Sequence, residues 1–172
     1  MDMIQQYKYN GKSHLAAIFG PLLASFAANW LKDLTSPLVI PVPLHPKRLR
    51  ERGFNQSLLL ARPVKDALSA DLDVFCLRRT RPTRPQTGLK SHQRRRNLRG
   101  AFGVVKKKAV KGRNVILVDD VSTTGTTLNE CARVLKRAGA DQVFGLVLAK
   151  TATGRKDPTR PPNPVLYTSS PD

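Results

Sequence analysis

The segment 115–128 (VILVDDVSTTGTTL) constrains the fold more than any other part of the chain. Its apolar run predicts a strand that helices cover on both faces, because a half-exposed strand would alternate with polar residues. Hydroxyl residues around a glycine follow, then a helical pattern over 125–138 and a second apolar run over 142–149. Strand, helix and strand in this order form a right-handed parallel unit. The sequence therefore predicts an α/β fold with a central, mostly parallel sheet flanked by helices.

Apolar periodicity and the positions of glycine and proline predict the remaining elements. Helices are expected over 13–34, split or kinked at Pro21, and over 54–70, with Pro63 as a defect inside. Short strands are expected over 38–42, 74–78, 101–105 and 114–118. Residues 44–53 are expected to form a basic loop, and the proline- and arginine-rich stretch after residue 78 a long excursion from the core.

Length and composition favour one globular domain. The chain has 172 residues, of which 40% are hydrophobic and 24% charged, and these values are ordinary for a protein with a packed core. No apolar run reaches the roughly 20 residues of a membrane span, and the start, MDMIQQYKYN, lacks the core of a secretory signal. We therefore expect a cytoplasmic protein without a membrane partner, with a domain over 1–151 and a loosely ordered tail over 152–172.

Charge and cysteine content narrow the partners. The formal net charge is +18 at pH 7, and the segments 45–52 and 78–99 hold nearly half of the lysines and arginines. Such an excess is typical of a solvated basic surface, of a site for phosphate-rich small ligands, or of a nucleic-acid partner. No C-x-x-C pair is present, so Cys76 and Cys131 are expected to be buried free thiols rather than zinc ligands.

Asp119 and Asp120 stand at the end of the predicted strand, where open parallel sheets bind ligands. Adjacent residues of an extended chain point in opposite directions, so the two carboxylates divide their roles unless the chain turns at once. Carboxylate oxygens accept hydrogen bonds from vicinal hydroxyls of a sugar and can hold a divalent cation through water.

The loop after these acids has the composition of an anion site. It consists of Ser122, Thr123, Thr124, Gly125, Thr126 and Thr127. Gly125 permits a close backbone approach, while the first amides and the dipole of the following helix favour a negative charge. The simpler alternative is a helix cap, which needs only one such residue. Together, the acids and the loop predict a site for a phosphorylated sugar.

This segment resembles the phosphoribosyl pyrophosphate (PRPP) signature of type I phosphoribosyltransferases. The segment 41–56 (PVPLHPKRLRERGFNQ), the run 85–89 (PQTGL) and the residues Arg94, Asn97 and Gly100 are similar to the ComF/GntX family. Longer members of that family carry a cysteine-rich zinc segment before this domain, so the chain is either a natural short form or a fragment.

The resemblance implies a type I phosphoribosyltransferase fold with a small hood over 79–102. It implies that Asp119 and Asp120 are catalytic and hold the ribose hydroxyls, and that residues 122–127 bind the 5-phosphate. The implied pyrophosphate residues are Lys47, Arg48, Arg50 and Arg52, and the implied hood residues are Gln86, Arg94 and Asn97. Mg²⁺ is implied as a cofactor that PRPP holds, without a direct protein ligand.

Three functions stay open at this point. The first is Mg²⁺-dependent transfer of phosphoribosyl to an unidentified nitrogen acceptor, with release of pyrophosphate. The second is a PRPP-binding protein without catalysis that acts in DNA uptake or utilisation and contacts single-stranded DNA nonspecifically. The third is another phosphosugar or nucleotide binder. A homodimer is an open alternative for the oligomeric state, because related folds often dimerise.

Overall fold

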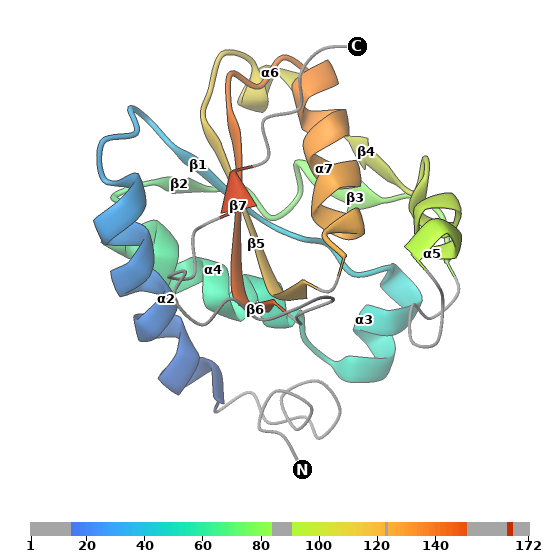
Figure 1. Cartoon of the computed structure of the whole chain (residues 1–172), viewed down its shortest axis with the longest axis horizontal. Coiled ribbons are helices and arrows are strands. Elements are labelled where there is room, and N and C mark those ends of the chain that lie inside the picture. Colours follow the sequence, from blue (N-terminus) through green and yellow to red (C-terminus); the bar gives the residue numbers. More distant parts are fainter. Residues whose placement is uncertain (1–14, 84–90, 123, 151–164, 167–172) are drawn as a thin grey trace.

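A five-stranded sheet forms the centre of the protein. The computed structural model describes residues 15–83, 91–122, 124–150 and 165–166. The strand order is β2 (Asp71–Leu72), β1 (Leu38–Pro41), β5 (Val115–Ser122), β6 (Val143–Lys150) and β7 (Val165–Leu166). The first four strands are parallel and β7 runs antiparallel to β6. The predicted mostly parallel α/β fold is confirmed (Figure 1).

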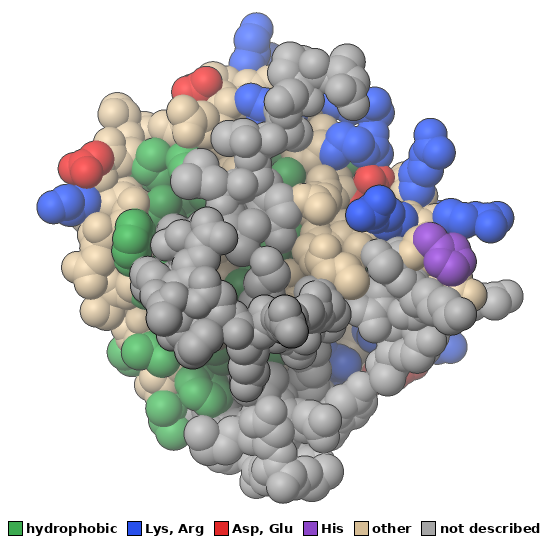
Figure 2. All heavy atoms as spheres, viewed as in Figure 1, with side chains coloured by type: hydrophobic (Ala, Val, Ile, Leu, Met, Phe, Trp, Pro, Cys, Tyr) green, Lys and Arg blue, Asp and Glu red, His purple; other side chains and the backbone are tan. Residues whose placement is uncertain are grey.

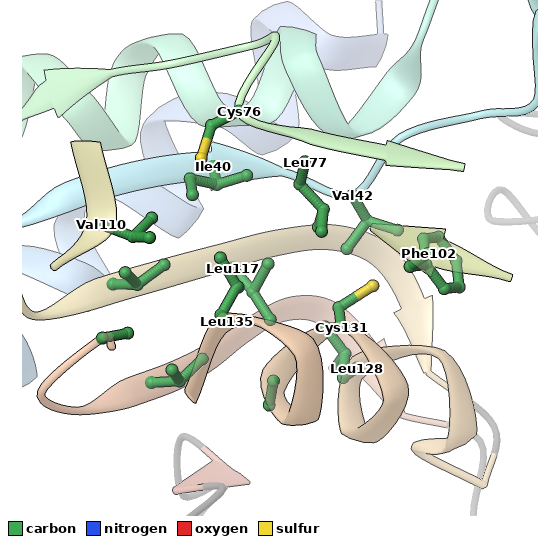
Figure 3. Packing of buried hydrophobic residues seen from close by; sticks show 14 of the residues in the cluster. Ile40, Val42, Cys76, Leu77, Phe102, Val110, Leu117, Leu128, Cys131 and Leu135 are labelled. Atoms are coloured by element: carbon green, nitrogen blue, oxygen red, sulfur yellow. The ribbon is translucent and has the colours of Figure 1, made fainter. Parts of the chain in front are cut away.

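Helices cover both faces of this sheet, as the apolar run predicted. In β5, Ile116 and Val118 face the cluster formed with α2 (Leu15–Leu31) and α4 (Gln56–Ala67). Val115 and Leu117 face the opposite cluster, which α7 (Thr126–Arg137) closes with Leu128, Cys131 and Leu135 (Figure 3). Because residues on a strand alternate between faces, one apolar run supplies both cores. Helix α2 continues through Pro21, so the expected split of this helix does not occur.

A small second unit lies against α7. It contains β3 (Leu77–Arg79), α5 (Ser91–Leu98) and β4 (Phe102–Val104), and the two strands pair antiparallel in a sheet of their own. Leu98 and Phe102 are buried in the same cluster as Leu128, which anchors this unit to the main domain. We keep the name hood for residues 79–102. Periodicity did not predict α5, because Leu98 is the one apolar residue of its sequence SHQRRRNL.

The predicted basic loop over 44–53 is wrong, because most of it forms helix α3 (Pro46–Arg52). The side chain of His45 accepts a hydrogen bond from the amide of Lys47 at 3.3 Å, and Pro46 occupies the first helical position. Gly53, at φ 77°, ends the helix and donates its amide to the carbonyl of Leu49 at 2.8 Å. No residue of α3 is buried, so apolar periodicity could not reveal it.

Other expectations had mixed outcomes. Strand β1 ends at Pro41, as its prolines required, and both cysteines are buried free thiols. The short helix α6 (Lys107–Val110) and strand β2 were not predicted. Within the tail, residues 165–166 form β7, and the rest lies outside the described residues. Among the described helices, none is both long and apolar enough to cross a bilayer.

Candidate functional site

The two acids lie within β5 rather than after it. The strand continues through Asp119 and Asp120 to Ser122, and Asp119 is in register with Val147 of β6. This corrects the expected strand end at residue 118. Both carboxylates are half-buried, and they occupy the carboxyl end of the parallel sheet. Neighbouring residues of a strand alternate between its faces, so the two acids have different surroundings in the protein.

The Asp119 carboxylate is held by α4. The hydroxyl of Ser57 donates to Asp119 Oδ1 at 2.9 Å, and the amide of Asp120 donates to the same oxygen at 3.0 Å. Ser57 is buried, and its own amide donates to the N-cap residue Asn55 at 3.1 Å. Asn55 Nδ2 in turn donates to the carbonyl of Val42 at 3.1 Å. These bonds fix the orientation of Asp119 by joining the ends of β1 and β5 to the start of α4.

The Asp120 carboxylate is stabilised locally. Its Oδ1 accepts a hydrogen bond from the amide of Val121 at 2.7 Å, which lies within the ordinary range for such bonds. One half-buried carboxylate is therefore fixed by a side chain from another element, and its neighbour by the strand itself. This arrangement presents carboxylate oxygens at the carboxyl end of the sheet.

The loop after β5 leads directly into α7. Ser122 is buried, and its hydroxyl has no hydrogen-bond partner among the described residues. Thr123 lies outside the described residues. The hydroxyls of Thr124 and Thr126 lie 2.7 Å apart, and Gly125 takes a left-handed conformation with φ 72°. A residue with a Cβ is strained there, so the turn into the helix depends on glycine.

Helix α7 begins at Thr126, one residue after the predicted start at residue 125. The amide of Asn129 closes the first turn on the carbonyl of Gly125 at 2.9 Å. The earlier amides of a helix have no partner inside it, and the helix dipole adds partial positive charge at this end. The loop can therefore bind an anion such as a phosphate group.

A cleft of about 280 Å³ separates α3 from the hood. Lys47 and Arg48 line it from α3, and Arg79 lines it from β3. The other lining residues are His45, Glu51, Pro82 and Thr83. Of the remaining predicted pyrophosphate residues, Arg50 is exposed on α3, and Arg52 Nη1 lies 3.4 Å from Gln56 Oε1. The four predicted cations therefore lie on one short helix but do not all line the cleft.

The predicted hood residues are placed in part. Asn97 and the backbone of Arg94 belong to α5, whereas Gln86 lies outside the described residues. The guanidinium of Arg81 donates to the carbonyls of Asn97 and Arg99, both at 3.0 Å, and so fixes the end of α5. The amide of Gly100 donates to Glu130 Oε1 of α7 at 2.7 Å. The hood is thus hydrogen-bonded to α7, the helix that follows the loop 122–127.

Sequence reasoning missed three residues of this site. Ser57 and Glu130 act through partners that are distant in the chain, at separations of 62 and 30 residues. Arg79 stood inside the predicted hood, but nothing in the sequence distinguished it from its arginine neighbours. The Asn55 N-cap was the available signal for Ser57, since a capping residue precedes the apolar pattern of α4.

The sheet, the acid pair and the hydroxyl loop define a domain of the phosphoribosyltransferase type. A family model described as phosphoribosyl transferase domain matches residues 55–166, which is well over half of the chain. Among solved structures, glutamine PRPP amidotransferase from B. subtilis superimposes with a TM-score of 0.51 and 21% identity. That match covers 76% of this chain and 26% of the other. At this identity the similarity concerns the fold alone.

Curated relatives narrow the family. DNA utilization protein YhgH of Escherichia coli O157:H7 is 38% identical over 152 residues, which cover 87% of this chain and 66% of that protein. Competence protein F of Haemophilus influenzae is 37% identical over 153 residues, which cover 86% and 67%. The chain thus spans about two thirds of the length of these relatives. It belongs to the phosphoribosyl transferase domain family and, within it, to the ComF family.

Proposed function

We propose that the protein binds PRPP with Mg²⁺ and transfers its phosphoribosyl group to a nitrogen acceptor with release of pyrophosphate. The observation that carries this proposal is the sequence of groups along β5 and α7. Two half-buried carboxylates lie near the carboxyl end of the central strand, and Gly125 then turns the chain into α7, whose dipole favours a negative charge at its start.

Each part of PRPP has a matching set of residues. The 5-phosphate would bind the loop 122–127 and the first amides of α7, where a negative charge is favoured. The ribose hydroxyls would donate to Asp119 and Asp120. The diphosphate would bind Lys47 and Arg48 on the wall of the cleft, because an ammonium group attracts phosphate as a point charge and a guanidinium group matches phosphate oxygens bidentately.

The residues present fit a magnesium ion that the ligand brings with it. Mg²⁺ keeps several waters and prefers oxygen ligands, and it binds through one or two carboxylates together with substrate phosphates. Asp119 and Asp120 supply such oxygens at the sheet edge, with Asp119 fixed by Ser57. When bound, the ion would neutralise part of the charge on the diphosphate.

The protein itself would position the sugar and stabilise charge. Loss of pyrophosphate leaves positive charge on the ribose ring, and the carboxylates of β5 would stabilise this charge if the ring binds beside them. The cations of α3 would stabilise the departing diphosphate, and the hood would exclude water from C1. No covalent protein intermediate is needed for this displacement.

A double substitution tests the proposal. Asp119→Asn with Asp120→Asn removes both charges while it keeps the side-chain shapes. We expect PRPP affinity in the presence of Mg²⁺ to fall at least about tenfold, equal to about 1.4 kcal/mol. Isothermal titration calorimetry measures this affinity, and release of pyrophosphate with candidate nitrogen acceptors tests the transfer itself.

The matched control is Asp66→Asn, because Asp66 is an exposed aspartate whose ion-pair partner is its chain neighbour Lys65. This variant should bind PRPP as the parent protein does. Thermal unfolding of each variant separates a lost ligand contact from a lost fold, since Asp119 also accepts a hydrogen bond from Ser57. Unchanged PRPP affinity in the double variant would remove the sugar-binding role of the two acids.

Contact with single-stranded DNA is a second candidate function. Lysine and arginine side chains gather over α5, α7 and α6 in Figure 2. The exposed members in this region include Arg95, Arg96, Arg99, Arg137, Lys107 and Lys108. Two relatives are named DNA utilization protein and competence protein. Such a surface contacts the phosphate backbone without reading bases.

Salt dependence tests this second candidate. Neutralising Z phosphates of a single strand gives a slope of roughly −0.7Z in a plot of log affinity against log salt concentration. Substitution of Arg95, Arg96 and Arg99 by glutamine should therefore reduce the slope by about two. Fluorescence anisotropy with a labelled oligonucleotide measures it. An affinity that does not change with salt concentration would exclude a backbone contact.

A further inference from the structure

Arg79 is a cation of the hood that faces the cleft. It ends β3, pairs with Phe102 of β4, and its guanidinium carbon lies 5.5 Å from the centre of the Phe102 ring. Its Nη2 contacts the hydroxyl of Thr83. The adjacent Arg78 is exposed, because consecutive residues of a strand point to opposite faces. The ring and the hydroxyl therefore hold the Arg79 guanidinium in place at the wall of the cleft.

Part of this guanidinium has no partner in the protein. Nε of Arg79 is buried, and among the described residues nothing accepts a hydrogen bond from it. No described carboxylate forms a salt bridge with Arg79 either. A buried donor without an acceptor is unfavourable, and more so when it carries charge. In Arg79, burial together with the charge of Arg48 lowers the pKa of the guanidinium, whereas the charge of Asp119 raises it.

The opposite wall of the cleft adds more positive charge. Arg48 and Lys47 line it from α3, and the lining residues include one acid, Glu51. No described lysine, arginine or histidine lies within ion-pair distance of Glu51. The described residues that line the cleft include no phenylalanine, tyrosine or tryptophan, so they offer a neutral flat ring no aromatic face to stack on. An anion bound here would satisfy donors from both walls.

We propose that Arg79 and Arg48 bind one acid group of the ligand from the two sides of this cleft. The inference rests on the proposed function and extends it to the hood. The acid group is a phosphate or a carboxylate, for which the planar fork of arginine is suited. It has two sources, the diphosphate of PRPP or an acid group on the nitrogen acceptor, and the experiment separates them.

The first arm of the experiment uses the full chain and three variants, with calorimetry in the presence of Mg²⁺. The variants are Arg79→Gln, Arg48→Gln and the matched control Arg78→Gln, and the ligands are PRPP, pyrophosphate and ribose 5-phosphate. If the diphosphate is the source, Arg79→Gln weakens PRPP and pyrophosphate at least about tenfold and leaves ribose 5-phosphate unchanged. The control binds all three ligands as the parent protein does.

The second arm compares acceptor analogues that differ by one acid group, with PRPP bound. Suitable pairs are nicotinate with nicotinamide, and orotate with uracil. If the acceptor is the source, the acid of a pair binds at least about tenfold more tightly than its neutral partner, and Arg79→Gln removes this preference. The double variant Arg48→Gln with Arg79→Gln is measured in the arm in which Arg79→Gln changes the affinity. Its loss of binding free energy should be smaller than the sum of the losses in the two single variants, because both side chains bind one group.

The outcomes are distinct. If neither ribose 5-phosphate nor PRPP binds the parent protein, the proposed function is refuted. The affinity for pyrophosphate would still test the role of Arg79. Arg79→Gln that behaves as Arg78→Gln in both arms would overturn the inference. If Arg79→Gln does not fold, Arg79→Lys, which keeps the charge and loses the fork, replaces it. A lysine variant with the same affinities as the parent protein in both arms would also overturn it.

Discussion

The bond between the hood and α7 makes a prediction that the structure defines in detail. Glu130 Oε1 accepts the amide of Gly100 at 2.7 Å, and the carboxylate also accepts two bonds from Arg133, at 2.6 and 3.0 Å. The Glu130 side chain is 12% exposed. Gly100 stands between α5 and β4, with a left-handed φ of 68°. Glu130 therefore holds the hood at the point where its chain turns back toward the core.

Glu130→Gln keeps the shape of the side chain and one acceptor oxygen but removes the charge. A hydrogen bond to a charged group contributes about 1.5–3 kcal/mol, against about 0.5–1.5 kcal/mol for a neutral one. The ion pair with Arg133 adds at most about 0.5 kcal/mol, because the Arg133 side chain is 35% exposed and can return to water. We expect the free energy of unfolding to fall by about 1–2 kcal/mol.

The loss should depend on pH. Burial raises the pKa of the Glu130 carboxyl, but the hydrogen bonds from Arg133 and Gly100 and the charge of Arg137 outweigh burial and hold it below the ordinary value of 4.5. A lowered pKa contributes stability above the ordinary value and loses it as pH falls through the folded value. The difference between the parent protein and Glu130→Gln should be full at about pH 7 and shrink below about pH 4.

Urea denaturation at about pH 7 and about pH 3 measures this difference, with Asp66→Asn as the exposed control. Hydrogen exchange at the amide of Gly100 reports on the same bond and should lose protection in Glu130→Gln. Equal stability of the variant and the parent protein near neutral pH would refute the assigned contribution. A deficit of the same size in acid would show that the carboxylate charge is not its cause.

Two further predictions concern the elements that position the site. Gly53→Ala should destabilise the protein by about 1 kcal/mol in urea denaturation, because φ is 77° while no atom lies within 4 Å of the added Cβ. A cost near zero would show that α3 ends equally well without a left-handed residue. Leu117→Ala should lower the free energy of unfolding by about 2–5 kcal/mol, because the Leu117 side chain of β5 is fully buried in the cluster that α7 closes. A loss below 1 kcal/mol would mean that the core refills the space that the side chain leaves.

The parts of the fold that the sequence predicted correctly share one property, a dense local pattern. The run of residues 115–118 needs two covered faces, and the structure supplies them. Residues 128, 131 and 135 recur at helical spacing and form the buried face of α7. In each case, neighbours in the chain carry the information, so periodicity and the βαβ rule suffice to place the strand, the loop and the helix of the candidate sugar site.

The missed elements are those in which tertiary contacts replace a local pattern. Strands β2 and β7 have two residues each and are defined by their pairing with β1 and β6. Helix α3 has no buried residue, so its evidence lay in its ends, where His45 and Pro46 start it and Gly53 stops it. The basic composition of residues 44–53 suggested a loop because this segment has no apolar periodicity. The capping residues of α3 were nevertheless present in the sequence.

The same distinction explains why the sequence revealed one half of the site and not the other. The candidate sugar half of the site lies on consecutive residues, from Asp119 to Thr127, so the sequence alone could predict its chemistry. The cleft is made where α3 meets the hood strand β3, and Arg48 and Arg79 are far apart in the chain. An arginine in an arginine-rich segment becomes distinctive only when the fold buries its Nε and gives it no acceptor. The part of the ligand that contacts Arg79 must therefore be learned from binding measurements on variants, since no pattern of neighbours encodes it.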